Sequence, residues 1–219
     1  MFIKSRPSWA DVAFCAALLL AAGCRGGRQA SSSVTGTETI VVIRHGEKAK
    51  GGLGQLSCKG LNRALALPKV LVGRFGRANA IFAPNPSVEL RESAASPTEY
   101  SYVRPLATIE PTAIQLGLPV NTQIGFPDIG ALQKAVTAPE YANSTVFIAW
   151  EHKYAYDFAR QMLKTYGLDR AQVPFWEAND FETLHVFHIA RAPGRNPMMT
   201  FAVQQEGLSE SLPDVCPAQ

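Results

Sequence analysis

Residues 39–47, Thr-Ile-Val-Val-Ile-Arg-His-Gly-Glu, decide the fold of this chain. Ile40 to Ile43 form an unbroken run of β-branched apolar residues, which is typical of a strand buried on both faces in a parallel sheet. The run stops at Arg44 and His45, so a cation and an imidazole directly follow the strand. Because ligands bind outside the carboxyl ends of strands in open α/β sheets, this strand end is the first candidate for a site.

Residues 145–150, Thr-Val-Phe-Ile-Ala-Trp, predict a second buried strand, and Glu151 and His152 follow it. Further strands are expected at residues 80–83, 182–190 and 198–203. Helices are expected from Ser57 to Gly73, from Arg104 to Gly117, from Asp128 through Val136, and from Ala155 to Tyr166. Pro68 is expected to kink or divide the first of these helices. Strands that alternate with helices predict a three-layer α/β/α sandwich with a mostly parallel central sheet.

Length and charge limit the classes of protein to which the chain can belong. A length of 219 residues accommodates one domain with a sizeable core. The formal net charge of +3 is small, and the basic residues are scattered, with no stripe of interleaved aromatic residues. The composition therefore gives no indication of a nucleic-acid partner.

The N-terminal residues have the pattern of an export signal. Lys4 and Arg6 precede an apolar run over residues 12–22, which is too short to span a bilayer comfortably and ends at Gly23-Cys24. Residues 20–24 resemble a bacterial lipobox, although Ala21 replaces the usual large aliphatic residue. This resemblance implies a lipoprotein signal peptide over residues 1–23 and a lipid on Cys24; an ordinary cleaved signal or a buried apolar helix are the alternatives.

The same pattern predicts where the protein is found and how it is divided. Residues 24–36 are rich in Gly, Ser and Arg, which favours a flexible tether, and residues 37–219 form the expected domain. We therefore expect an exported, membrane-anchored lipoprotein of the cell envelope, in the periplasm. With Cys15 in the signal and Cys24 lipidated, Cys58 and Cys216 remain, and an oxidising compartment permits a disulfide between them or leaves them as two thiols.

The polar residues at the two strand ends form a pattern that suits an anion. If the two strands are parallel, His45 and His152 lie at the same edge of the sheet, and Arg104 at the start of a helix completes the group. Arginine binds phosphate in a bidentate manner and keeps its charge at neutral pH. A neutral imidazole is a competent nucleophile towards phosphorus, so the sequence predicts a site for phosphoryl transfer.

These residues resemble the motifs of the histidine phosphatase superfamily, also called phosphoglycerate-mutase-like. The resemblance rests on Arg44-His45-Gly46 after a buried strand, on Arg104 with Thr108, and on residues 150–152, Trp-Glu-His; it covers residues 37–190. It implies that His45 is the nucleophile that becomes phosphohistidine, and that Arg44 and Arg104 bind the phosphate. It further implies that His152 stabilises the transition state, and that neither a metal nor an organic cofactor is needed.

Three departures from the family pattern concern the leaving-group side of the site. Lys153 stands where many relatives have glycine, residues 84–103 form a longer segment than usual, and no aspartate follows His152. The proton donor is therefore open among four acids, Glu92, Glu99, Asp128 and Glu151. Glu47 is expected to orient His45 or to contact the substrate.

Other polar and aromatic residues have a structural interpretation. His185 and His188 have metal-ligand spacing, but residues three apart on a strand point to opposite faces, so we expect no metal site. Trp150 and Trp176 are expected in the core or in a pocket wall. The resulting hypothesis is a phosphatase that acts on small phosphorylated substrates. The alternatives are a phosphomutase and an envelope protein that binds phosphorylated ligands, or is structural, without turnover.

Overall fold

A six-stranded sheet lies at the centre of the computed structural model, which describes residues 35–92 and 98–217. The strand order is β10-β9-β1-β8-β4-β7, where β1, β8, β4 and β7 are parallel neighbours and β9 runs antiparallel to β1 and β10. The bounds are β1 Gly36–Arg44, β4 Ala80–Phe82, β7 Val120–Asn121, β8 Thr145–Trp150, β9 Thr183–Arg191 and β10 Met198–Gln205.

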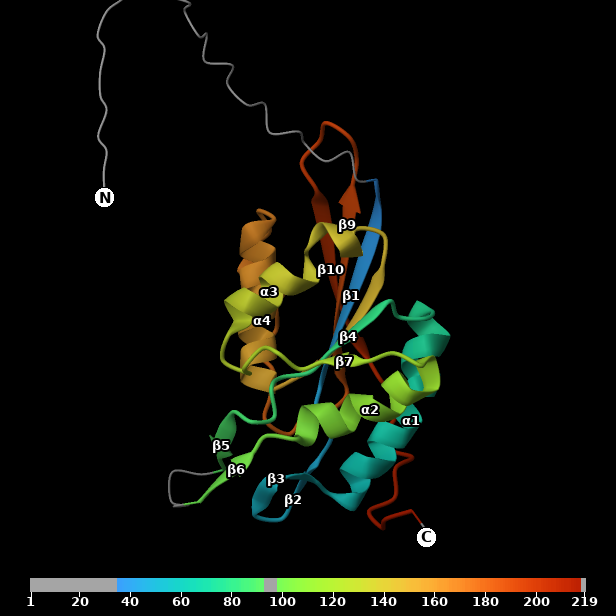
Figure 1. Ribbon diagram of the computed structural model, residues 1–219, viewed down its shortest axis with the longest axis vertical. Coiled ribbons are helices and arrows are strands. Elements are labelled where there is room, and N and C mark those ends of the chain that lie inside the picture. The colour runs from blue at the N-terminus through green and yellow to red at the C-terminus, as the bar shows by residue number, and fades with distance from the viewer. Residues whose placement is uncertain (1–34, 93–97, 218–219) are drawn as a thin grey trace, which may run out of the picture. The chain divides into compact units, whose positions relative to one another are not determined.

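Helices cover both faces of this sheet. Helices α1 (Cys58–Phe75) and α2 (Arg104–Leu116) pack on one face, and α3 (Ile129–Val136) and α4 (His152–Thr165) pack on the other (Figure 1). Each face has its own apolar cluster between sheet and helices. The predicted three-layer α/β/α sandwich with a mostly parallel sheet is therefore confirmed.

Strand β1 is the centre of both clusters. Residues 40–43 are at most 1% exposed, and alternate side chains point to opposite faces. Val41 packs with α1 and α2, whereas Val42 packs with the α3 and α4 side. Burying each such side chain contributes roughly 1.5–3 kcal/mol, so this stretch anchors the sheet as the sequence predicts.

Helix boundaries follow local signals in the sequence. The Ser57 hydroxyl accepts the Gly60 N–H at the start of α1, and the Asp128 carboxylate accepts the Ala131 N–H at the start of α3. Pro68 does not divide α1, because the helix runs unbroken to Phe75. That part of the prediction is wrong. Pro68 is one of the buried residues of α1, and a proline inside a helix removes one backbone hydrogen bond.

Two small hairpins lie beyond the carboxyl edge of the sheet (Figure 1). One is β2 (Lys48–Ala49) with β3 (Gly52–Leu56), which follows the first strand. The other is β5 (Glu89–Arg91) with β6 (Glu99–Ser101), within the long segment 84–103. Two single turns of 3₁₀ helix, Pro139–Tyr141 and Arg170–Gln172, complete the described elements.

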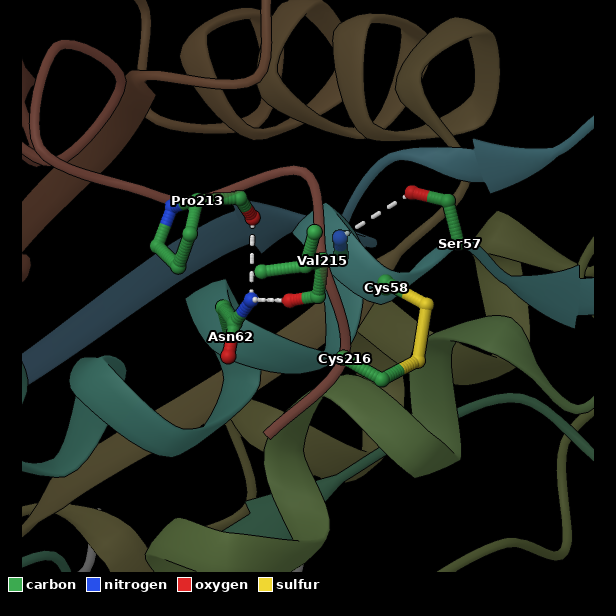
Figure 2. The surroundings of a disulfide bond; sticks show 7 residues. Ser57, Cys58, Asn62, Pro213, Val215 and Cys216 are labelled. Atoms are coloured by element: carbon green, nitrogen blue, oxygen red, sulfur yellow. Dashed lines mark hydrogen bonds between the residues drawn. A yellow bond between two sulfur atoms is a disulfide. The ribbon is translucent and has the colours of Figure 1, made fainter. Parts of the chain in front are cut away.

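The C-terminal segment is fastened to the first turns of α1. Cys58 and Cys216 form a disulfide across 158 positions of the chain, and the Asn62 amide donates hydrogen bonds to the Pro213 and Val215 carbonyl oxygens (Figure 2). A disulfide that closes so long a loop restricts the unfolded chain and typically contributes about 2–4 kcal/mol.

The expectations for the N-terminus lie outside the described residues. They comprise the signal peptide over residues 1–23, the lipidation of Cys24 and all but the last two residues of the tether over residues 24–36. Within the described ranges, none of the helices has the length and apolar character needed to cross a membrane.

Candidate active site

The candidate site forms where β1 and β8 end side by side. The two strands are parallel and in register, with Arg44 opposite Trp150, so His45 and His152 emerge at one edge of the sheet. The His45 N–H donates to the Trp150 carbonyl oxygen at 3.1 Å, which extends the pairing by one residue. The structure therefore brings together the two histidines that the sequence placed at strand ends.

The His45 imidazole is held in one orientation. Its side chain is buried, and its Nδ1 lies 2.7 Å from the Gly46 carbonyl oxygen. Because a carbonyl oxygen can only accept a hydrogen bond, Nδ1 carries the proton, and the lone pair of the neutral ring is on Nε2. The backbone next to the histidine thus selects the tautomer in which Nε2 carries the free lone pair.

Burial also keeps this imidazole neutral. The loss of solvent lowers the pKa of His45 well below its usual value of 6.5, and the positive charge of Arg104 lowers it further. The hydrogen bond to Gly46 opposes this shift without reversing it. His45 is therefore unprotonated at neutral pH, as nucleophilic attack requires.

Arg44 and Arg104 present buried donors to the same space. Arg44 is 4% and Arg104 is 3% exposed, and no acceptor in the described part of the chain meets the Nε–H of either. Buried donors of native proteins are normally paired, so these two guanidinium N–H groups are available to acceptors of a ligand in the cavity. Burial lowers the pKa of Arg44 to about 10, which leaves it charged at neutral pH.

Arg44 is supported from the loop that precedes β9. Its Nη1 donates to the carbonyl oxygens of Glu177 and Asp180, at 3.2 and 2.8 Å, and its guanidinium stacks 4.0 Å from the centre of the Phe181 ring. These contacts fix the plane of the guanidinium. This loop could not be predicted as part of the site, because no motif in its residues marks it as a neighbour of β1.

Glu151 and His152 form a second fixed pair. The Glu151 carboxylate caps α4 by accepting the N–H groups of Lys153 and Tyr154, and its other oxygen lies 2.6 Å from His152 Nδ1. Burial would raise the pKa of Glu151, but these hydrogen bonds outweigh it and hold the pKa below its usual value. An ionised Glu151 therefore orients His152 and is not suited to donate a proton.

The loop after β1 requires close backbone packing. A Cβ atom at Gly46 would come within 2.9 Å of the Gly60 carbonyl oxygen, so only glycine fits beside the first turn of α1. The Thr108 hydroxyl accepts the Gly46 N–H at 2.9 Å and donates to the Arg104 carbonyl oxygen at 2.8 Å. This hydroxyl joins the loop that carries His45 to the start of α2, where Arg104 lies.

One cavity of about 270 Å³ is lined by Arg44, His45, Arg104, Glu151 and His152. Besides the residues above, its walls contain Leu90, Phe126 and Tyr154. The cavity also contains Glu92, which follows β5, ion-pairs with Arg104 and accepts the Gly54 N–H at 3.0 Å. The segment 84–103, which is longer than usual in the family pattern, thus supplies a carboxylate to the site.

The other predicted acids lie elsewhere. Glu99 pairs with Arg91 at 3.0 Å outside the cavity lining, and Asp128 caps α3. Glu47 does not line the cavity either, because its carboxylate receives two hydrogen bonds from Arg63. Of the two roles expected for Glu47, this geometry favours positioning of the loop that carries His45, because the loop turns the Glu47 side chain towards α1.

The residues set aside by the sequence analysis lie as expected. His185 is buried and His188 is exposed on β9, so the two side chains do not meet. Trp150 and Trp176 are both core residues, at 0% and 2% exposed. In residues 35–92 and 98–217 no group of three or more His, Cys, Asp or Glu side chains is placed to hold a metal ion.

The fold is similar to the folds of solved structures that are named as phosphatases or as a hydrolase. A protein from Nakamurella multipartitia with the provisional name phosphohistidine phosphatase SixA is 16% identical, with a TM-score of 0.53 over 78% of this chain and 96% of that chain. A structure named mycobacterial hydrolase 1 is 14% identical, with a TM-score of 0.51 over 77% and 98%. Mycobacterial glucosyl-3-phosphoglycerate phosphatase, solved with inorganic phosphate, is 13% identical, with a TM-score of 0.50 over 77% and 97%. No protein-family model matches the sequence, and the comparison with curated proteins gave no significant match.

Proposed function

We propose that this protein is a histidine-type phosphatase that hydrolyses small phosphate monoesters through a phosphohistidine at His45. One observation carries the proposal: a buried neutral imidazole with its proton on Nδ1 shares a cavity with two arginines whose Nε–H groups lack acceptors. Phosphoryl oxygens would satisfy these donors and place phosphorus within reach of Nε2. The histidine phosphatase fold supports this assignment.

The first step transfers the phosphoryl group to the enzyme. His45 Nε2 forms a bond to phosphorus while the bond from phosphorus to the leaving oxygen breaks. The charge on the transferring oxygens is stabilised by Arg44, Arg104 and His152, which are already oriented by the protein and therefore need little rearrangement. The leaving oxygen takes a proton as it departs, so the product leaves as an alcohol.

Glu92 is the acid best placed to give that proton. It is the only one of the four candidate acids that lines the cavity without capping a helix. When phosphoryl oxygens bind Arg104, they replace the Glu92 carboxylate as its partner. Glu92 then takes up a proton from solvent and gives it to the leaving oxygen in the first step. In the second step water attacks the phosphohistidine, gives its proton to Glu92 and releases phosphate, which regenerates His45.

Phosphate release from an aryl phosphate by the purified full chain tests the proposal. We expect turnover in the parent, with and without a chelator, and a loss of at least about 10³-fold in His45→Ala, because the covalent route is removed. His188→Ala, which changes an exposed histidine on β9, is the matched control and should retain activity. Full activity in His45→Ala would overturn the mechanism. If the parent binds phosphate but never hydrolyses a substrate, the protein is a binding protein. If it transfers phosphate to a second substrate, it is a phosphomutase.

We also propose that the protein is exported and held at the membrane by a lipid on Cys24. The disulfide between Cys58 and Cys216 supports an oxidising compartment, because such bonds persist there and are rare in the cytosol. In a bacterial host, Cys24→Ala should move the protein from the membrane fraction to the soluble fraction. Unchanged partitioning would reject lipidation.

A further inference from the structure

The cavity has a second zone above the phosphoryl site. Arg44, His45 and Arg104 form its buried floor, whereas three exposed cations line its mouth: Lys48 of β2, Arg91 of β5 and Lys153 of α4. We call these three residues the cationic rim. They come from separate parts of the chain, so the fold, and not local sequence composition, brings them to one opening.

The charges of the cavity exceed what one phosphoryl group neutralises. Five lysine and arginine side chains line it against two carboxylates, Glu92 and Glu151. Both carboxylates have internal partners, since Glu92 pairs with Arg104 and Glu151 holds His152. A phosphate monoester brings about two negative charges, so positive charge remains at the rim after it binds.

Of the three rim residues, Lys153 is the one whose position contributes least to the stability of the fold. It lies in the first turn of α4, where the helix dipole disfavours a cation. Within the described residues, no carboxylate lies within ion-pair distance of its ammonium group. A cation that is exposed, unpaired and unfavourable for its helix, at the mouth of a cavity, is well placed to meet an anionic ligand.

The other two rim residues are available as well. Lys48 Nζ is 4.0 Å from the nearest Glu92 oxygen and its side chain is 52% exposed, so that contact is weak. Arg91 pairs with Glu99 at 3.0 Å, but both side chains are about half exposed, and such pairs contribute little. A ligand that reaches the rim can therefore recruit both cations at small cost.

We propose that the cationic rim binds a second anionic group of the substrate, a carboxylate or a second phosphate, while the floor binds the group that is transferred. The inference rests on the proposed phosphatase function and names its substrate class. The cavity volume of about 270 Å³ suits a small substrate, because sites for drug-sized ligands range over about 300–1,000 Å³. Leu90, Phe126 and Tyr154 provide apolar walls for the carbon atoms between the two anions.

Matched pairs of substrates test this proposal with the full chain. Phosphoglycolate and ethyl phosphate differ by a carboxylate, and propane-1,3-diol bisphosphate and propyl phosphate differ by a second phosphate. We expect a higher kcat/KM for the doubly anionic member of at least one pair. Because the leaving groups differ in reactivity, the informative quantity is the ratio within a pair, compared between parent and variant.

Lys153→Gln is the decisive variant. The ratio should fall by roughly three- to tenfold, through KM more than kcat, because one charged contact to the second anion is lost. Lys164→Gln changes an exposed lysine in the last turn of the same helix and is the matched control, which should leave the ratio unchanged. The substrate pair whose kcat/KM ratio falls in Lys153→Gln shows whether the rim prefers a carboxylate or a phosphate.

Two outcomes would overturn the inference while the phosphatase function stands. In the first outcome, the protein hydrolyses the substrates, but the kcat/KM ratio within each pair is the same in the parent, in Lys153→Gln and in Lys48→Gln/Lys153→Gln. The other is a preference for phosphoethanolamine, whose second group is a cation. If nothing is hydrolysed, calorimetric binding of the same pairs still tests the rim, since Lys153→Gln should weaken binding of the doubly anionic member only. Equal weakening of both members would also contradict the inference.

Discussion

The Arg63 guanidinium donates two hydrogen bonds to the Glu47 carboxylate, at 3.0 and 2.8 Å. Glu47 lies two residues beyond His45, so this pair fixes the loop that carries the nucleophile to helix α1. Arg63 is fully buried and also contacts the carboxylates of Glu182, at 2.6 Å, and Glu206. One guanidinium therefore joins the nucleophile loop, α1, β9 and the C-terminal segment.

Arg63→Met should be strongly destabilising. Removing the cation leaves three carboxylates without their partner, and the loss of one member of a buried ion pair typically costs about 3–5 kcal/mol. Urea denaturation measures the change in the free energy of unfolding. Arg195→Met, at an exposed arginine, should change it by less than about 0.5 kcal/mol. A cost below about 1 kcal/mol for Arg63→Met would show that the cluster is not needed for stability.

Glu92→Gln should affect substrates according to their leaving group. A general acid contributes about 10²–10⁴-fold when the leaving oxygen is a poor leaving group. We therefore expect a large loss of kcat with an alkyl phosphate and a small loss with p-nitrophenyl phosphate, whose leaving group departs without a proton. Steady-state kinetics with both substrates measures the difference. An equal loss with both would assign Glu92 to the positioning of Arg104.

Activity should persist into mildly acidic solution. Burial and Arg104 lower the pKa of His45 well below 6.5, and a protonated imidazole cannot attack phosphorus. As pH falls, kcat should therefore decline only below pH 6.5, when His45 takes up a proton. A pH–rate profile checks this, with histidine NMR to identify the group. A decline centred at or above pH 6.5 that follows the His45 resonances would contradict the buried, neutral state.

The buried His185 should make stability sensitive to acid. It packs against Trp176 and Phe201, and burial lowers its pKa from 6.5 to about 4. Its contribution to stability is therefore complete above the unfolded-state pKa of 6.5 and is lost as pH falls towards 4, because the unfolded chain then binds more protons.

His185→Leu should reduce that loss by roughly 3 kcal/mol between pH 7 and pH 4. Urea unfolding at both pH values measures it, and His188→Gln on the exposed face serves as control. Because the pKa of His45 is also lowered, some pH dependence will remain in the variant. An unchanged pH dependence in His185→Leu would show that the protein accommodates the charged ring.

The predictions that succeeded depend on short-range patterns. The apolar run at residues 40–43, the run at 146–150 and the capping residues Ser57 and Asp128 each specify their element locally. Parallel pairing then follows from the alternation of strands and helices, and it brings His45 and His152 together. Much of the site was therefore predictable from the sequence.

The residues that were not predicted reach the site through long loops. Phe181 supports Arg44 from a loop that is more than 130 positions later in the chain, and its own neighbours carry no motif. The sequence did not distinguish Glu92 from the three other candidate proton donors. The β5–β6 hairpin places Glu92 beside Arg104. The sequence analysis does not single out Arg63, yet Arg63 is fully buried among carboxylates. Such loop and side-chain placements depend on tertiary contacts that composition does not encode.

The phosphohistidine itself is the most direct test of the proposed mechanism. The full chain is mixed with a radiolabelled phosphate ester, quenched with alkali within one turnover, and digested for mass spectrometry. The account predicts a label that is stable in base and labile in acid, located on His45 and absent in His45→Ala. Turnover that proceeds with no label on His45, or with the label on another residue, would contradict it.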